Sequence, residues 1–331
     1  MKKHLAKLLA GGAIAAMALT GCGSGSPSGS SGAPAAESGA ADSGLTKIAV
    51  GVLPIAPSGA MQYGIDEGIF EKHGLDVELQ TGQGGAAMLP AVSTGTMNFA
   101  VGNPLSVMTA VDKGLDMKIV SGYSASRAEG EDNNAVIVKA DSGIESFADL
   151  AGKTTAVNTL KTQGDLTIME SAAEDGADPS KLKFSEMPFP DMEAQLERGN
   201  VDAIWVPEPF QSKALANKDY KLLGYPNQKT LPGLPTMVTF TSGSYAEQNP
   251  EIVADFKAAV TETLKGAEAD NDSVRAVLPD FMGMPEEVAK NLKMEVFDGE
   301  VRSQVLSDMG ELMVKYKYVD NQPDVQAMTV K

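Results

Sequence analysis

Side chains that could act as nucleophiles, general bases or metal ligands are scarce in this chain. Its 331 residues contain one cysteine, Cys22, and two histidines, His4 and His73. A structural zinc site takes about four ligands, mostly cysteine and histidine, so the sequence excludes one. Ser–His–Asp or Cys–His catalysis would have to use His73, and a single cysteine cannot form a disulfide within the chain. We therefore expect no metal, no cofactor and no catalytic residue, which leaves amides, hydroxyls and carboxylates for binding.

The charge and composition narrow the choice of partner. The chain carries 27 lysines and arginines against 44 aspartates and glutamates, a formal net charge of −17. Binding to a phosphate backbone needs a basic surface, so a nucleic acid is excluded as the main partner. The length suits two lobes better than one small core, and a hydrophobic content of 43% indicates that most of the chain folds.

The N-terminus is laid out like a bacterial lipoprotein signal. Three lysines within the first seven residues precede a short apolar segment, 8–19, which is too short to span a bilayer. Leu19-Thr20-Gly21-Cys22 resembles a lipobox, in which the signal is cleaved before the cysteine and the cysteine is lipidated. Residues 1–21 are then a signal peptide and Cys22 is the lipidation site, the alternative being a free thiol. Loss of the three lysines changes the net charge from −17 to −20.

Residues 22–44 are expected to form a flexible tether. After the cysteine they contain only glycine, serine, alanine and proline, with one glutamate and one aspartate. Such a segment cannot bury enough apolar surface to offset the entropy of ordering it. At about 5–6 Å × √n, a coil of this length reaches roughly 25 Å, so the folded body would stay close to the membrane.

The rest of the chain alternates between strand and helix. The apolar, β-branched run 47–53 ends at Pro54, and Ser58 can cap a helix that runs to Lys72. Further strands are expected at 76–80, 98–101, 117–121, 135–138, 154–157, 183–186 and 202–206, with helices between them and a mainly helical segment from 250. This repeat of strand, turn and helix predicts an α/β fold with mostly parallel sheets.

Four segments, in order along the chain, resemble one family. They are Gly68 to Leu79, Ser93 to Ala100, Ile144 to Lys153 and Arg198 to Phe210. They resemble the nitrate/sulfonate/taurine-type solute-binding proteins of ABC importers, a group that also includes thiamine-pyrimidine binders. The resemblance implies a type II periplasmic-binding-protein-like fold. Each of its two lobes would be a mixed, mostly parallel sheet flanked by helices, with a two-strand hinge and the ligand in the cleft. The first lobe would comprise residues 45–139 and 240–331, and the second lobe residues 140–239.

Most side chains within these segments are interpreted as structural. Two glycines, Gly74 and Gly152, suit backbone turns. The large apolar residues are expected to be core residues rather than ligand contacts: Phe70, Leu75, Val77, Phe99, Leu150 and Trp205. The loops beside the segments would then hold the ligand.

Candidate ligand-binding residues follow from the ends of the predicted strands. In open α/β sheets, ligands bind where the carboxyl ends of strands lead into helix N-termini, which offer free N–H groups. Several candidates have an equally plausible structural role, as helix caps or as turn glycines. The candidates are Ser58, Gln83, Gly84, Gly85, Asn103, Ser124, Asn158, Thr159, Thr162, Asp191 and Glu208.

The charged residues near these loops bear on the ligand class. Lys161 and Arg127 are the cations nearest to them, whereas Asp191 and Glu208 lie at two strand ends. Two like charges 4 Å apart repel by about 1 kcal/mol in water and about 4 kcal/mol at an effective dielectric constant of 20, and a helix N-terminus returns only about 0.3–2 kcal/mol. A Glu208 that faces the cleft would therefore favour an amine, amide or aminopyrimidine donor. Alternatively, Glu208 points to solvent.

The function expected from the resemblance is that of an extracytoplasmic solute-binding lipoprotein, a monomer anchored to the bacterial cell membrane through Cys22. It would capture a small organic nitrogen- or sulfur-containing solute, sulfonate/taurine-like or pyrimidine-like, and deliver it to an ABC permease and ATPase. One alternative is a ligand sensor lipoprotein without transport. Another is a thiamine-pyrimidine-type enzyme on the same fold. The chain lacks that enzyme's cysteine-rich motif, although carboxylate chemistry by Asp191 and Glu208 stays open.

Overall fold

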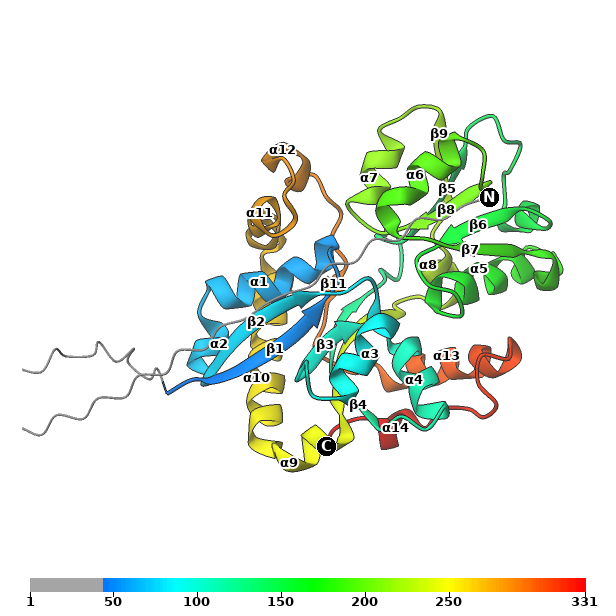
Figure 1. Cartoon of the computed structure of the whole chain (residues 1–331). Helices are drawn as coiled ribbons and strands as arrows, with labels where there is room; N and C mark the ends of the chain where they lie inside the picture. Colours follow the sequence, from blue (N-terminus) through cyan, green and yellow to red (C-terminus); the bar gives the residue numbers. More distant parts are fainter. Residues whose placement is uncertain (1–43) are drawn as a thin grey trace, which may run out of the picture. The chain divides into compact units, whose positions relative to one another are not determined.

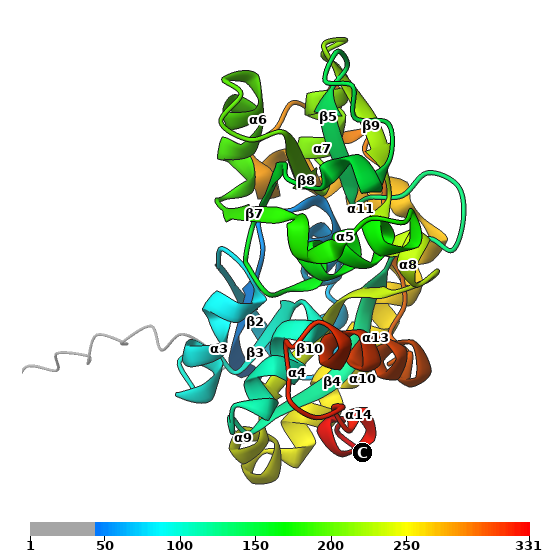
Figure 2. The same ribbon diagram turned by 90° about the vertical axis from the view of Figure 1, so that its right-hand side faces the viewer.

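Two β-sheets organise residues 44–331, the part of the chain that the computed structural model describes (Figures 1 and 2). The predicted signal peptide, the lipidation site Cys22 and the tether lie outside these residues, apart from residue 44. Strands and helices alternate along the described chain as the sequence predicted. None of the helices in residues 44–331 has both the length and the apolarity needed to cross a bilayer.

The first sheet has six strands in the order β11-β4-β10-β3-β1-β2. Strand β1 pairs in parallel with β2 and β3, whereas β10 runs antiparallel to β3 and β4, and β11 runs antiparallel to β4. This mixed sheet is the framework of the first lobe. Its strands are β1 Thr46–Val52, β2 Leu75–Thr81, β3 Phe99–Gly102, β4 Met117–Ala125, β10 Pro235–Ser242 and β11 Val296–Phe297.

The second sheet has five strands in the order β7-β6-β8-β5-β9 and is the framework of the second lobe. Strand β6 is parallel to β7 and β8, whereas β5 is antiparallel to β8 and β9. Its strands are β5 Ala135–Lys139, β6 Thr154–Val157, β7 Lys183–Glu186, β8 Ala203–Val206 and β9 Tyr220–Gly224.

The lobe boundaries lie a few residues before those predicted. The sequence assigns the segment of β5 to the end of the first lobe, but β5 lies between β8 and β9 and pairs with both, so it belongs to the second sheet. Strand β10 already lies in the first sheet at Pro235. The chain thus crosses between the sheets twice, after β4 and before β10. Runs of apolar residues mark the strands, but they do not say which sheet a strand joins.

Helices cover the sheets, and one predicted helix is interrupted. The helix expected from Ser58 to Lys72 is a 3₁₀ turn followed by two helices, because Gly68 adopts a left-handed φ of 65° between them. The first-lobe helices are α1 Gly59–Asp66, α2 Ile69–Lys72, α3 Gly85–Ser93, α4 Pro104–Asp112, α9 Gly243–Gln248, α10 Pro250–Ala269, α11 Asn271–Met282, α12 Glu286–Ala289, α13 Ser303–Lys315 and α14 Val325–Met328. Those of the second lobe are α5 Gln163–Glu174, α6 Phe189–Glu197, α7 Phe210–Leu215 and α8 Pro226–Thr230, and short 3₁₀ turns lie at Ala56–Ser58, Phe147–Leu150 and Pro179–Lys181.

The central strands of each sheet, such as β3 and β10 in the first and β5 and β8 in the second, are buried on both faces. In β5, Ala135 and Ile137 face one apolar cluster, while Val136 and Val138 face another, as the twofold period of a strand requires. In the first lobe a single larger cluster joins the N-terminal strands to helices from the C-terminal part of the chain. The C-terminal segment is therefore an integral part of the first lobe.

A substitution at the contact between Phe256 of α10 and Phe99 of β3 tests this packing directly. The two rings stack with centroids 3.9 Å apart and planes 12° from parallel, and both are fully buried. We predict that Phe256→Ala lowers the free energy of unfolding by about 3–5 kcal/mol, because it leaves a cavity in the core. Denaturant unfolding measures the change. Val288→Ala, at an exposed residue, is the control and should change the free energy of unfolding by less than about 0.5 kcal/mol. A Phe256→Ala loss as small as the control's would contradict the packing.

Candidate functional site

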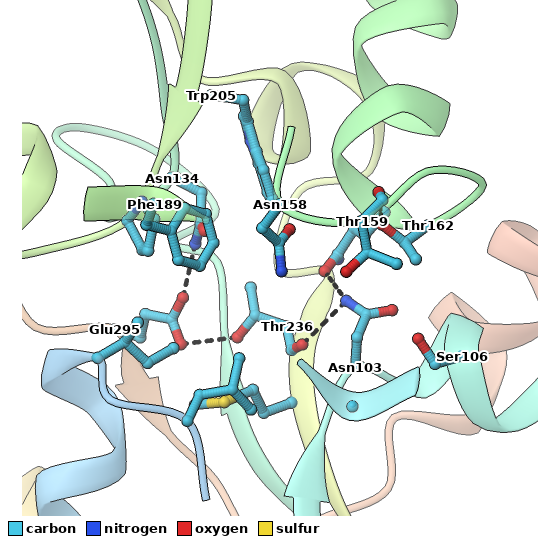
Figure 3. A pocket seen from close by; sticks show the side chains of 16 residues that line it. Asn103, Ser106, Asn134, Asn158, Thr159, Thr162, Phe189, Trp205, Thr236 and Glu295 are labelled. Atoms are coloured by element: carbon cyan, nitrogen blue, oxygen red, sulfur yellow. Dashed lines mark hydrogen bonds between the residues drawn. The ribbon is translucent and has the colours of Figure 1, made fainter. Parts of the chain in front are cut away.

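A cavity lies between the two sheets and is lined by both lobes (Figure 3). Its volume is about 50 Å³, so the lobes stand close together around it. Apolar side chains from the first lobe form one wall: Leu53, Ile55 and Met237. The remaining lining is mainly polar, with two aromatic rings: Gly85, Asn103, Ser106, Asn134, Asn158, Thr159, Thr162, Gln163, Phe189, Trp205, Pro207, Thr236 and Glu295.

Strand direction explains why these residues meet. The carboxyl ends of the parallel strands β1, β3, β6 and β8 lead into the cavity, as expected for an open α/β sheet. The antiparallel strands run the opposite way, so their first residues lie at the same edge. Asn134 immediately precedes β5, Thr236 is the second residue of β10, and Glu295 immediately precedes β11.

Five of the predicted site residues line the cavity. They are Gly85, Asn103, Asn158, Thr159 and Thr162. A sixth, Gly84, lies beside them, because a Cβ atom built on it would stand 3.2 Å from the Thr159 hydroxyl oxygen of the other lobe. A larger residue at 84 would therefore press on the facing loop.

The other predicted residues lie elsewhere. Ser58 is buried and its hydroxyl has no hydrogen-bond partner, while the Gln83 and Asp191 side chains are exposed. Ser124 is buried behind the cavity, with its hydroxyl 2.9 Å from the Thr236 hydroxyl. None of these four side chains lines the cavity.

Glu208 occupies neither of the two positions considered from the sequence. Its side chain is fully buried, and its carboxylate accepts hydrogen bonds from the Ser212 amide at 2.9 Å and the Ser212 hydroxyl at 2.6 Å. Burial raises the pKa of this carboxyl, and the Ser212 hydrogen bonds partly oppose the shift. The carboxylate thus stabilises the first turn of α7 rather than contacting the cavity, and an argument about ligand class cannot depend on it.

A different carboxyl, Glu295, faces the cavity. Its side chain is only 2% exposed, and its two oxygens accept hydrogen bonds from Asn134 Nδ2 at 2.6 Å and from Thr236 Oγ1 at 2.7 Å (Figure 3). Burial raises its pKa to about 7. Hydrogen bonds from Ser124, Thr236 and Asn134 lower the pKa, while the nearby Asp132 raises it further. A carboxyl with this pKa is in equilibrium between its neutral and ionised forms near neutral pH.

Asn103 connects the two lobes. Its side-chain oxygen accepts from the Leu105 amide and so caps α4, as the sequence allowed. Its Nδ2 donates to Gln163 Oε1 of the second lobe and, at 3.2 Å, to the Thr236 carbonyl (Figure 3). The same residue is therefore a cap, a lobe-to-lobe contact and part of the cavity wall.

Trp205 lines the cavity in addition to its expected place in the core. It is 6% exposed, packs in the second lobe's apolar cluster, and has no partner for its buried indole N–H. The Phe189 ring lies 6.2 Å from it at an angle of 50°. A buried N–H group without a hydrogen-bond partner is costly.

The cations considered from the sequence do not reach this cavity. Lys161 is exposed, and the Arg127 guanidinium donates to the Met294 carbonyl at 3.3 Å. No lysine, arginine or histidine of the described chain is among the lining residues. Within residues 44–331, no group of three or more His, Cys, Asp and Glu side chains is placed to hold a metal ion.

The chain is similar to known proteins in both sequence and fold. A family model described as NMT1/THI5 like matches residues 59–273. The aliphatic sulphonate binding protein SsuA from Escherichia coli has a TM-score of 0.70, with 18% identity over 85% of this chain and 96% of that one. The alkanesulfonate-binding protein SsuA from Xanthomonas axonopodis pv. citri, bound to MOPS, has a TM-score of 0.71, with 16% identity over 86% of this chain and 98% of that one.

Two further similarities concern nitrate proteins from Synechocystis. The periplasmic nitrate-binding protein NrtA has a TM-score of 0.68, with 14% identity over 86% of this chain and 84% of that one. The curated relative, the nitrate import ATP-binding protein NrtC, is 24% identical over 303 residues. They cover 82% of this chain, and the match spans only 44% of the relative. At these identities the solved structures establish the shared fold: two mixed sheets flanked by helices.

The raised pKa of Glu295 predicts a pH dependence of stability. The folded state holds this proton more tightly than the unfolded state does, so the stabilising contribution is fully present below about pH 4.5 and is lost as the pH rises through 7. Relative to Glu295→Gln, the wild type should lose about 3 kcal/mol of unfolding free energy between about pH 4 and pH 8. Urea unfolding across this range measures the difference. Asp191→Asn, at an exposed carboxyl, should follow the wild type. Parallel curves for wild type and Glu295→Gln would show that Glu295 does not titrate in this way.

Proposed function

The chain belongs to the NMT1/THI5-like family, and from that membership we propose that it is the solute-binding component of an ABC importer. It captures a small organic nitrogen- or sulfur-containing solute between its lobes and delivers it to the permease. The observation that carries the proposal is the cavity itself. Both lobes supply its walls, and Asn103 connects them directly through Gln163.

The chemistry of the cavity supports binding rather than catalysis. Amides, hydroxyls and two aromatic rings dominate its lining. These groups orient a small molecule without forming covalent bonds to it. Glu295 is the one titratable residue among the described residues that line it. The two carboxylates considered for catalysis from the sequence, Asp191 and Glu208, do not line it. The solute would then leave the protein chemically unchanged.

The sequence and the relatives support the proposed importer partners and location. The printed names of the similar proteins describe a periplasmic sulphonate binding protein, a periplasmic nitrate-binding protein and an ATP-binding protein of nitrate import. By analogy, this chain acts outside the cytoplasm with a permease and an ATPase. We propose that residues 1–21 direct its export and that lipidated Cys22 holds it, as a monomer, at the cell membrane.

A thermal-shift panel on the full chain, purified in mild detergent, tests solute binding. The panel covers sulfonates, nitrate, bicarbonate, aminopyrimidines and aromatic acids. A ligand present at about 100 times its dissociation constant stabilises the protein by about 2.7 kcal/mol, which corresponds to several degrees at roughly 2–4 °C per kcal/mol. We expect one class to raise the midpoint and to be recovered intact by mass spectrometry. Conversion of the ligand to a product would instead identify an enzyme.

Cell fractionation tests the anchor. We predict that the wild-type chain partitions with membranes and incorporates labelled palmitate, because a lipidated cysteine adds apolar area that inserts into the bilayer. The Cys22→Ser variant should carry no label and keep its signal peptide uncleaved, whereas the neighbouring Ser24→Ala variant should behave like the wild type. If the Cys22→Ser variant still incorporated labelled palmitate, the lipid would be attached at another residue and the prediction would be wrong.

A further inference from the structure

The Glu295 carboxylate can accept more hydrogen bonds than the protein donates to it. A carboxylate has about four acceptor positions on its two oxygens. Asn134 and Thr236 each fill one, on different oxygens. The Ser124 hydroxyl, which also shares a hydrogen bond with the Thr236 hydroxyl, contributes as well. At least one acceptor position is therefore left on a carboxyl that faces the cavity.

No cationic side chain of residues 44–331 lines the cavity beside Glu295. The charged group acting on Glu295 is a second carboxyl, Asp132, which is itself held by the Ser126 hydroxyl and the Arg127 amide. The nearby Lys293 ammonium is paired with Glu131 at 2.9 Å. The electrostatic environment of the site is therefore negative.

These facts constrain the ligand. A buried carboxylate without a cation is unfavourable unless donors complete its hydrogen bonding or a positive charge approaches. A bare anion 4 Å from the ionised carboxylate would bind up to about a thousandfold more weakly than beside the neutral carboxyl, at an effective dielectric constant of 20. Such an anion therefore binds only if Glu295 takes up a proton. An N–H group on the ligand would complete the hydrogen bonding of Glu295. An acceptor on the same ligand could take a hydrogen bond from the side-chain amide of Asn158, which points into the cavity (Figure 3).

We propose that Glu295 determines the ligand class of this cavity by accepting a hydrogen bond from an N–H group of the ligand. The cavity then takes a small organic molecule with an amine, amidine or ring-bound amino group, together with a hydrogen-bond acceptor. When Glu295 is ionised, the cavity rejects nitrate and simple alkanesulfonates. This inference rests on the proposed function, since it names the solute class of the same site.

Isothermal titration calorimetry on the full chain in mild detergent tests the inference. The donor probes are 4-aminopyrimidine and benzamidine, and the anion probes are nitrate and ethanesulfonate. At pH 9, where Glu295 is ionised, we expect at least one donor probe to bind the wild type and neither anion to do so. Glu295→Gln should weaken donor binding by roughly 10–100-fold, the loss typical of a hydrogen bond to a charged group. Glu208→Gln is the matched control, a buried carboxyl that contacts Ser212 instead of the cavity, and should stay within about twofold.

A second readout separates ligand contact from a purely structural role. A ligand N–H favours the ionised form of Glu295, so donor binding near pH 7 should release part of a proton. The dependence of the binding enthalpy on buffer ionisation measures this release. The release should vanish at pH 9 and in Glu295→Gln. Because the wild type alone shows it, the test does not depend on the variant folding.

The outcomes distinguish the inference from the proposed function. Binding of nitrate or ethanesulfonate at pH 9 in preference to the donor probes would overturn the inference while solute binding stands. Donor binding that Glu295→Gln leaves unchanged, or that releases no proton near pH 7, would overturn it as well. If a donor probe binds through Glu295 but is converted to a product, the inference stands and the proposed function falls. No binding of any probe at about 10 mM, weaker than ordinary solute affinities, would count against both.

Discussion

The burial of one carboxyl, Glu295, constrains the region where the two lobes meet. A buried carboxyl must find hydrogen-bond donors, and here they come from Asn134 at the start of β5 and Thr236 at the start of β10. Ser124 of β4 extends the network through Thr236. The Glu295 carboxyl therefore contacts both segments that cross between the sheets, and Glu295 directly precedes strand β11. Because the network leaves an acceptor position toward the cavity, the same constraint that orders the crossings also prepares a ligand contact.

The fold alone does not decide the ligand. The sulphonate-, alkanesulfonate- and nitrate-binding proteins share this architecture at 14–18% identity. Binding groups lie on loops and strand ends, where side chains change without disturbing the sheets. In this chain those positions carry Asn103, Asn158 and Glu295, and Trp205 also lines the cavity. A cavity of this composition favours a molecule that both donates and accepts hydrogen bonds.

The sequence predicted the α/β alternation and the positions of most strands because apolar, β-branched runs and turn residues are local signals. It also placed Asn103 and Thr159 at the cavity, since both follow a strand that ends there. It missed Asn134, Thr236 and Glu295, which lie at the starts of antiparallel strands. Strand direction depends on pairing between distant segments, and no local pattern reveals it. Glu208 was expected near the ligand because it follows a strand end. Its carboxylate instead accepts hydrogen bonds from Ser212 in the helix that follows.

A crystal structure of the full chain with the tightest-binding donor probe would show whether Glu295 contacts the ligand. We predict that the probe lies in the cavity between the lobes, with an N–H group about 2.7–3.2 Å from a Glu295 carboxylate oxygen. We also predict that Asn134 and Thr236 keep their hydrogen bonds to that carboxylate. A probe bound elsewhere on the protein, or bound in the cavity with its N–H groups turned away from Glu295, would contradict the account.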